Sequence, residues 1–189
     1  MLAHTPLIEI TPPDYDVVVD IRYATAHNFT NKAVYARPAC FLHPDAATCV
    51  RRAIAYAADF GMRLKIFDAY RPPEAQWVLW NHTPDPNFLA DPAKGSPHSR
   101  GVAVDLTLLD AQGHEVDMGT AFDEFSPRSH HGAEDITTDA KRNRLLLLGI
   151  MTSAGFDFYR NEWWHYQLFN SRTYDLIPDA HSGAHMMPT

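Results

Sequence analysis

Four residues of this sequence have the types and the spacing of a catalytic metal site. His98 and Asp105 lie seven positions apart, and Glu162 and His165 lie three apart in the second half of the chain. Two imidazoles and one carboxylate are a ligand set that suits Zn²⁺, and three protein ligands leave a fourth position for water. Glu162 is then free to act as the base that takes a proton from that water. The pattern predicts a hydrolytic metal centre with one Zn²⁺ per chain.

Two predicted strands have to position these residues. Residues 102–109 alternate between apolar side chains and small or polar ones, which predicts a strand with Asp105 on its polar face. Gly101 allows the chain to bend there, so that His98 can converge on the same point. The aromatic-rich run 162–169 predicts a second strand. Residues three apart on a regular strand face opposite sides, so Glu162 must lie at the entry of this strand or across a bulge.

The rest of the chain mixes helices and strands without a regular βαβ alternation, which favours an α+β fold. We expect a mostly antiparallel sheet that carries the zinc site and is flanked by helices. Further strands are predicted at 17–21, 64–67 and 114–116 and a proline-rich loop at 83–97. Helices are predicted at 45–60 (capped by Asp45, ended by Gly61), from 73 through 80, and at 139–153 (Leu145, Leu148, Met151 and Thr152 on one face, ended by Gly155).

The length of 189 residues fits a single catalytic domain, 1–189, with a peripheral C-terminal tail at 176–189. The net charge of −7 argues against nucleic acid or a membrane surface as the main partner. Since the N-terminus lacks a basic start followed by a long apolar run, we expect a cytoplasmic protein. Cys40 and Cys49 are expected as reduced thiols, with a bridge between them as the less favoured alternative. The oligomeric state is left open.

Several of these features have simpler explanations when each is taken alone. A single histidine is most often a surface or core residue, and Glu-x-x-His is a weak pattern. The combination with His-x6-Asp is what makes the metal site specific. The neighbouring His130 and His131 cannot easily share one metal and are expected to support the loop or the site. Core packing is expected for Trp163 and Trp164, and no role is expected for His181 and His185.

A family resemblance is carried by the segments with the metal ligands and by motifs outside them, and it spans residues from about 15 to about 170. They are Asp20-Ile21-Arg22-Tyr23-Ala24-Thr25 with Asn28-Phe29, Asp68-Ala69-Tyr70-Arg71-Pro72, residues 96–107, Met118-Gly119-Thr120-Ala121-Phe122-Asp123, Arg128-Ser129-His130-His131 and Glu162-Trp163-Trp164-His165-Tyr166. In these segments the chain resembles the zinc D-alanyl-D-alanine dipeptidases of the vancomycin-resistance type. That family belongs to a superfamily with D,D-carboxypeptidases, lysostaphin-like endopeptidases and the hedgehog fold.

The resemblance implies a role for eight residues. By similarity, the zinc ligands are His98, Asp105 and His165, the general base is Glu162, the group that holds the charged oxygen of the tetrahedral intermediate is Arg71, the carboxylate that captures the free amino group of the substrate is Asp123, and further substrate contacts are Tyr23 and Ser96. The implied reaction is hydrolysis of the small dipeptide D-alanyl-D-alanine to two D-alanines. Without the resemblance, Arg71 would be read as a surface arginine at a proline-flanked turn.

The chain also departs from the family pattern. Pro97 separates Ser96 from His98, Asn31 occupies the place of an expected glycine, and the connection 73–95 is short, which leaves the substrate range open. Two alternatives remain: a D,D-carboxypeptidase acting on peptidoglycan stem peptides, and a non-catalytic zinc-binding protein. The sequence does not choose between antibiotic resistance, recycling of cell-wall D-alanine and nutrient use.

Overall fold

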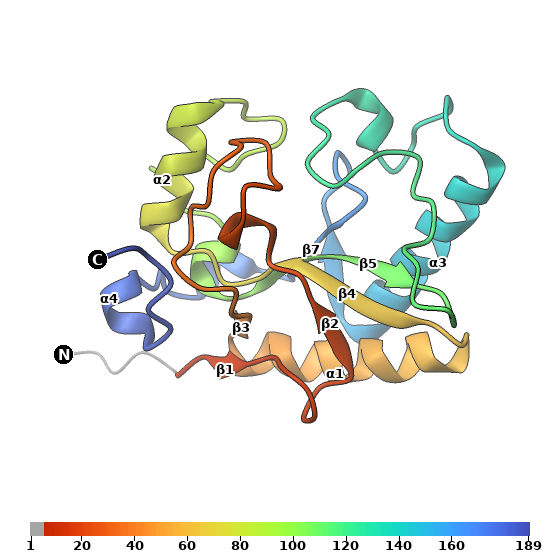
Figure 1. The fold of residues 1–189 in the computed structure, drawn as a ribbon, viewed down its shortest axis with the longest axis horizontal. Coiled ribbons are helices and arrows are strands. Elements are labelled where there is room, and N and C mark those ends of the chain that lie inside the picture. Colours follow the sequence, from red (N-terminus) through yellow and green to blue (C-terminus); the bar gives the residue numbers. More distant parts are fainter. Residues whose placement is uncertain (1–5) are drawn as a thin grey trace.

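The computed structural model describes residues 6–189, and its central element is a five-stranded sheet with helices on one face and a group of loops on the other (Figure 1). The sheet has the order β2-β4-β5-β7-β6. Its strands are β2 (Val17–Val19), β4 (Arg63–Asp68), β5 (Ala103–Leu109), β6 (Phe156–Phe158) and β7 (His165–Leu168). Only β2 and β4 pair in parallel, so the predicted α+β fold with a mostly antiparallel sheet is confirmed. Strands β1 (Ile8–Glu9) and β3 (Phe41–Leu42) form a separate antiparallel pair.

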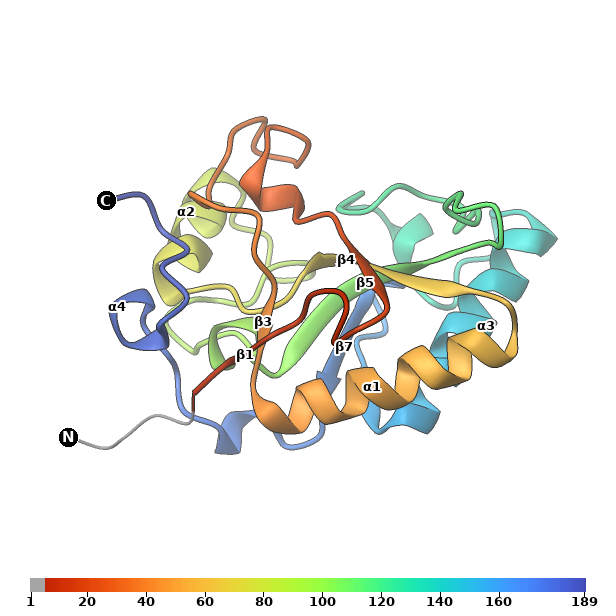
Figure 2. The same ribbon diagram turned by 60° about the horizontal axis from the view of Figure 1, so that its bottom comes forward.

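Two long helices cover one face of the sheet. Helix α1 (Pro44–Asp59) packs on β4, helix α3 (Thr138–Ala154) packs on β6, and the two helices contact each other (Figure 2). Helix α2 (Pro73–His82) lies on the opposite side, among the loops (Figure 1). The remaining helical segments are short: α4 (Asp179–Ser182) and the 3-10 turns η1 (Arg22–Ala24), η2 (His98–Arg100), η3 (Pro127–Ser129) and η4 (Ser171–Thr173).

Strand β5 is buried along its whole length. Alternation sends Val104, Leu106 and Leu108 to the face opposite Asp105, as predicted. The face that carries Asp105 is polar, but the loops cover it, and Asp105 is only 2% exposed. A buried carboxylate must be paired or must hold a cation, which makes this face of the sheet the place to look for chemistry.

Helix α1 differs from the prediction at its start. His43 is the N-cap, and its Nδ1 accepts a hydrogen bond of 3.2 Å from the backbone N–H of Asp45. Asp45 is therefore not the cap but lies in the first turn, where its charge complements the helix dipole. The predicted end is confirmed: Gly61, which follows the C-cap Phe60, lies in the left-handed region at φ 66°.

Helix α3 has nearly the predicted bounds but a different buried face. Of the four residues predicted on one face, Met151 is buried and Leu148 packs against the core, but Leu145 is 67% exposed and Thr152 is exposed as well, so the prediction is wrong for these two. The spacing of the buried positions, three or four residues from one turn to the next, places them on one face: Ala140, Arg144, Leu147, Ile150, Met151 and Ala154. Because four leucines follow one another at 145–148, apolar content alone could not select the face.

Three strand predictions also need correction. Residues 114–116 do not form a strand; Glu115 makes a single bridge with Leu109. The first strand ends at Val19, since the chain enters η1 shortly after it. The predicted strand 162–169 is shorter, because residues 159–164 form a turn and β7 begins at His165. Strand β6, immediately after Gly155, was not predicted.

The C-terminal segment is more than a peripheral tail. Ile177, Ala184 and Met186 are buried, and the backbone N–H of Ile177 donates to the carbonyl of Ser99 at 2.9 Å. Residues 176–189 therefore close one side of the core. Both Cys40 and Cys49 are buried free thiols. Within residues 6–189, no helix combines the length and apolar character needed to cross a membrane.

Candidate metal centre and substrate cavity

The pairing of β5 with β7 brings two predicted ligands side by side. Asp105 and His165 are direct partners in this antiparallel ladder, a position at which Cβ atoms are about 4.5–5.5 Å apart. His98 lies in η2, and Gly101 turns the chain from η2 into β5 at φ 69°. The predicted bend at Gly101 is confirmed, and it lets His98 reach the same point as the cross-strand pair.

Three donor atoms converge at this point. His98 Nε2 lies 3.0 Å from His165 Nδ1 and 3.3 Å from Asp105 Oδ1, and His165 Nδ1 lies 3.1 Å from the same oxygen. All three side chains are buried. The three residues form a group whose donor atoms lie within 4.8 Å of one another and could hold one metal ion.

Outer contacts fix the orientation of both imidazoles. His98 Nδ1 is 2.7 Å from the carbonyl oxygen of Ala69, and His165 Nε2 is 3.1 Å from Oε1 of Gln167. A neutral imidazole that donates one N–H to such an acceptor turns the lone pair of its other nitrogen to the metal. Burial alone would raise the pKa of Asp105, but His98 and His165 outweigh it and lower that pKa well below its usual range. The third candidate ligand, Asp105, is therefore an ionised carboxylate.

Glu162 lies in the turn that precedes β7, which resolves its spacing from His165. Because the chain is not a strand at this point, the two side chains can face the same space. Glu162 Oε2 is 3.9 Å from His165 Nδ1, and Glu162 is 5% exposed. Burial, followed by the negative charges of Asp105 and Asp123, raises the pKa of Glu162 well above its usual range. Such a carboxyl group can both accept and return a proton.

Arg71 is a buried residue and not a surface arginine; it is 5% exposed. Its Nε donates to Asp68 Oδ2 at 2.8 Å, and its Nη1 donates to Gln76 Oε1 at 3.0 Å. Its Nη2 lies 3.4 Å from Asp105 Oδ2, and the guanidinium lies over the ring of Tyr23, 5.0 Å from the centroid. These contacts hold a permanent positive charge beside the candidate metal ligands.

Asp68 belongs to the same group of buried charged residues but was not selected from the sequence. It ends β4, is completely buried, and accepts hydrogen bonds from Arg71 and, at 2.8 Å, from the hydroxyl of Tyr35. The sequence did offer a signal for Asp68: it is an acid at the end of a predicted strand, three residues before Arg71. Gln76 and Gln167 were also missed, since a glutamine that orients another side chain has no pattern of its own.

Asp123 and Tyr23, two residues that the resemblance assigns to substrate binding, contact each other. The Tyr23 hydroxyl donates to Asp123 Oδ2 at 2.9 Å. Burial, and next the charge of Asp105, raise the pKa of Asp123 to about 8. Ser96 Oγ accepts a hydrogen bond of 3.2 Å from the backbone N–H of His98, so it helps to place the first ligand. The structure thus gives each of these predicted residues a defined partner.

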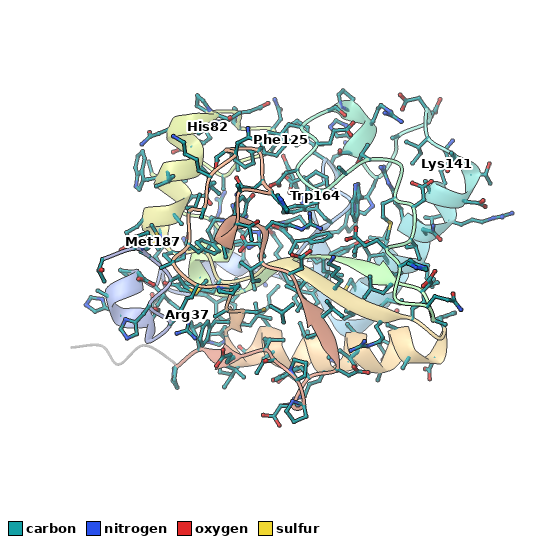
Figure 3. The ribbon with its side chains drawn as sticks, viewed as in Figure 1. Arg37, His82, Phe125, Lys141, Trp164 and Met187 are labelled. Atoms are coloured by element: carbon teal, nitrogen blue, oxygen red, sulfur yellow. The ribbon has the colours of Figure 1, made fainter. Side chains whose placement is uncertain are left out.

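One cavity of about 390 Å³ unites the site. All eight predicted residues line it: Tyr23, Arg71, Ser96, His98, Asp105, Asp123, Glu162 and His165. Trp164 is buried, as predicted, but it also forms part of the cavity wall. Figure 3 shows Trp164 on the side of the sheet where His82 and Phe125 lie, opposite α1. The cavity can hold a small polar ligand among charges of both signs.

Other histidines stay outside this group. His131 packs edge-on against the rings of Phe158 and Tyr166, and His130 lies near Phe88. The two tail histidines, His181 and His185, do not line the cavity. The sequence interpretation of His130 and His131 as loop support fits their place beside the turn that carries Glu162.

Comparisons with known proteins agree with this geometry. The profile of the peptidase M15 family, described as D-ala-D-ala dipeptidase, matches residues 5–183. A D-alanyl-D-alanine dipeptidase of Escherichia coli is 44% identical over 94% of this chain and 92% of its own length. Proteins with the same name from Enterococcus faecalis (38% identical; 80% of this chain, 85% of theirs) and Streptomyces coelicolor (37%; 79% and 84%) are also similar.

Proposed function

Because this chain belongs to the peptidase M15 family of D-Ala-D-Ala dipeptidases, we propose that it hydrolyses D-alanyl-D-alanine to two D-alanines. The observation that carries this proposal is the convergence of His98, Asp105 and His165 within hydrogen-bond distance of one another, in a cavity that Arg71, Asp123 and Glu162 also line. No other group of residues in the described chain offers ligands, a base and an oxyanion partner together.

We propose Zn²⁺ as the metal, with one ion per chain. Two imidazole nitrogens and one carboxylate oxygen are a typical catalytic zinc set, and ligands at about 2.0–2.1 Å in tetrahedral geometry lie roughly 3.3 Å from one another. The spacings of 3.0 to 3.3 Å between the three donor atoms fit that requirement. When bound, the ion would polarise the peptide carbonyl, acidify a water molecule and bring the raised pKa of Glu162 down.

The proposed chemistry assigns the proton transfers to Glu162. Its carboxylate takes a proton from the attacking water and passes it to the amine of the leaving D-alanine. The Arg71 guanidinium faces the carbonyl oxygen, where negative charge develops as the tetrahedral species forms. Its contacts with Asp68 and Gln76 keep it in that orientation during the reaction.

Asp123 is proposed to select substrates with a free amino group. A carboxyl group with a pKa of about 8 is mostly protonated near neutrality, and an ammonium ion beside it would lower that pKa and complete an ion pair. Tyr23 holds the carboxylate through its hydroxyl, and Ser96 lines the cavity as a further contact. A peptide whose amino group is acylated cannot form this pair, which favours a dipeptidase over a carboxypeptidase.

Turnover on free and N-acylated D,D-dipeptides tests the proposal. The zinc-loaded protein is expected to release D-alanine from D-alanyl-D-alanine. Glu162→Gln should lower kcat by about 10³-fold while the bound metal is retained. The matched control is Glu124→Gln, an acid of the same loop region as Asp123 that does not line the cavity. Inactivity of the wild type on every D,D-dipeptide would refute the proposal, and preference for the acylated peptide would instead indicate a D,D-carboxypeptidase.

We also propose a cytoplasmic site of action. The free thiols of Cys40 and Cys49 support this, because a reducing compartment maintains such thiols. Cell fractionation with an antibody to the protein tests the proposal, and recovery outside the cytoplasm would contradict it.

A further inference from the structure

Arg144 is a buried cation whose side chain hydrogen-bonds three backbone carbonyls. Its Nε donates to the carbonyl of Met118 at 2.6 Å, its Nη1 to that of His130 at 2.8 Å, and its Nη2 to that of Arg128 at 2.9 Å. Arg144 itself is 2% exposed and comes from the buried face of α3. Burying a cation to which no carboxylate is hydrogen-bonded costs free energy, so the presence of Arg144 in the interior needs an explanation.

The three carbonyls belong to the two ends of one loop. This loop comprises residues 118–130. Asp123 lies near its middle, and η3 lies near its end. A planar guanidinium offers several N–H donors in a fixed fork, and here that fork bonds both limbs of the loop at once. This rigid group therefore ties the two limbs together, in addition to the contact of 3.0 Å between the hydroxyls of Thr120 and Ser129.

Asp123 needs such a support. Its backbone lies at φ 61°, in the left-handed region that residues other than glycine rarely adopt. A conformation of this kind persists only where the surrounding structure enforces it. Towards the tip of the loop, Phe125 packs on the rings of Phe29 and Phe88, with centroids 4.9 and 5.0 Å away. At the base of the loop, the Arg144 guanidinium supports the backbone through its three hydrogen bonds.

We propose that Arg144 is a positioning residue for substrate recognition: by holding both limbs of the 118–130 loop, it keeps the Asp123 carboxylate in place for the substrate's ammonium group. This inference rests on the proposed function for the role of Asp123. Arg144 does not line the cavity, so it acts only through the loop.

The control is Arg52, an exposed arginine that also donates to a backbone carbonyl, in another part of the molecule. Its Nε donates to the carbonyl of Ala154 at 2.9 Å, and its Nη2 lies 3.0 Å from Cys49 Sγ, between α1 and the end of α3. Arg52→Met removes an arginine-to-carbonyl contact without touching the 118–130 loop. Arg144→Met removes the fork, and Arg144→Lys keeps a charge that can reach fewer carbonyls.

Two ligands separate positioning from a general loss of structure: D-alanyl-D-alanine, and N-propionyl-D-alanine, which lacks only the amino group. In Arg144→Met, KM for the dipeptide should rise by about tenfold, the size of one lost charge-assisted contact, with the Ki of N-propionyl-D-alanine unchanged. Arg144→Lys should fall in between, and Arg52→Met should match the wild type. The inference would be overturned if Arg144→Met weakened the binding of both ligands equally or changed the binding of neither. If Arg144→Met does not fold, Arg144→Lys is judged by the same comparison.

Hydrogen exchange of residues 119–126 gives a readout that needs no catalysis. Faster exchange in the Arg144 variants than in Arg52→Met supports the loop restraint, whereas unchanged exchange overturns it. An inactive wild type with the exchange difference present would refute the proposed function and leave the restraint itself standing.

Discussion

At the scale of single residues, the charged groups of the cavity hold one another in fixed positions. Asp68 bonds Arg71, and Arg71 in turn approaches Asp105, one of the candidate metal ligands. Each of these three side chains is almost completely buried, so water does not screen their interactions. The orientation of the guanidinium therefore depends on a carboxylate that need not touch the substrate.

The variant Asp68→Asn tests this dependence. Since asparagine keeps the shape but not the charge, kcat should fall by about tenfold or more, and the free energy of unfolding by about 3 kcal/mol, because a buried ion pair loses one partner. Activity assays and urea unfolding measure the two effects. Asp16→Asn is the control: its 2.7 Å pair with Arg63 is exposed, and its loss should cost below about 1 kcal/mol. Wild-type kcat in Asp68→Asn would contradict the role given to Asp68.

His131 should make stability depend on pH. Burial, and next the charge of Arg144, lower the pKa of His131 to about 4, whereas an unfolded histidine titrates near 6.5. Between these values the unfolded chain binds more protons, so stability is fully present above about pH 6.5 and declines by up to roughly 3 kcal/mol as the pH falls to about 4. Urea unfolding from pH 7 to pH 5 should show a smaller decline in His131→Gln than in the wild type or in the exposed-site control His27→Gln. Equal slopes in all three proteins would refute the effect.

At the scale of elements, the sequence predicted best where one physical signal dominated. Gly61, Gly101 and Gly155 all take the positive φ that ends a helix or turns a chain, as their positions indicated. The predicted apolar face of α3 was wrong at Leu145 and Thr152, because the run of leucines at 145–148 offers apolar side chains in every direction. Strand β6 was missed because three residues are too few for a period to be visible.

The site shows the same division. The types and spacing of the candidate ligands and of Glu162 predict metal chemistry from the sequence alone. Arg71, Asp123, Tyr23 and Ser96 could be selected only through the family resemblance. Asp68 and Gln167 act by orienting other side chains, and Arg144 by bonding backbone carbonyls. Such roles depend on which segments meet in space, and that information is not local in the sequence.

Gly101→Ala tests the turn that presents His98. A Cβ at this position would lie 2.8 Å from Leu7 Cδ2 and 3.1 Å from the backbone nitrogen of His43, on a residue at φ 69°. The strained conformation alone should cost about 1–2 kcal/mol of stability, and metal affinity should fall as His98 shifts. Thermal unfolding and metal titration measure both effects, with Gly132→Ala as the control, since its added Cβ meets nothing within 4 Å. A variant with unchanged metal affinity would show that the turn does not set the position of His98.

At the scale of the whole molecule, the candidate metal centre joins parts that are distant in the chain. Residues 98, 105 and 165 come from a turn and from two strands in the middle of the sheet. A ligand that binds only the folded state stabilises all of it at once. The core should therefore respond to metal as a unit.

Removal of metal should lower the melting temperature. At a zinc concentration one hundred times its Kd, binding adds about 2.7 kcal/mol, which corresponds to roughly 5–10 °C for a chain of this size. Calorimetry with and without chelator measures the shift. It should vanish in His98→Ala and persist in His114→Ala, whose side chain is 79% exposed. A chelator effect of equal size in His98→Ala would place the metal elsewhere.

The cross-strand pair of Asp105 and His165 also has a consequence for the folding of the enzyme during its synthesis. The two residues are 60 positions apart, so their contact adds to the contact order of the fold and must wait for a long loop to close. On a ribosome that works from the N-terminus, β4 and β5 emerge well before the second imidazole exists. A nascent or truncated chain that stops before residue 162 holds only two of the three candidate ligands and lacks Glu162. We therefore expect hydrolytic activity only when synthesis is nearly complete.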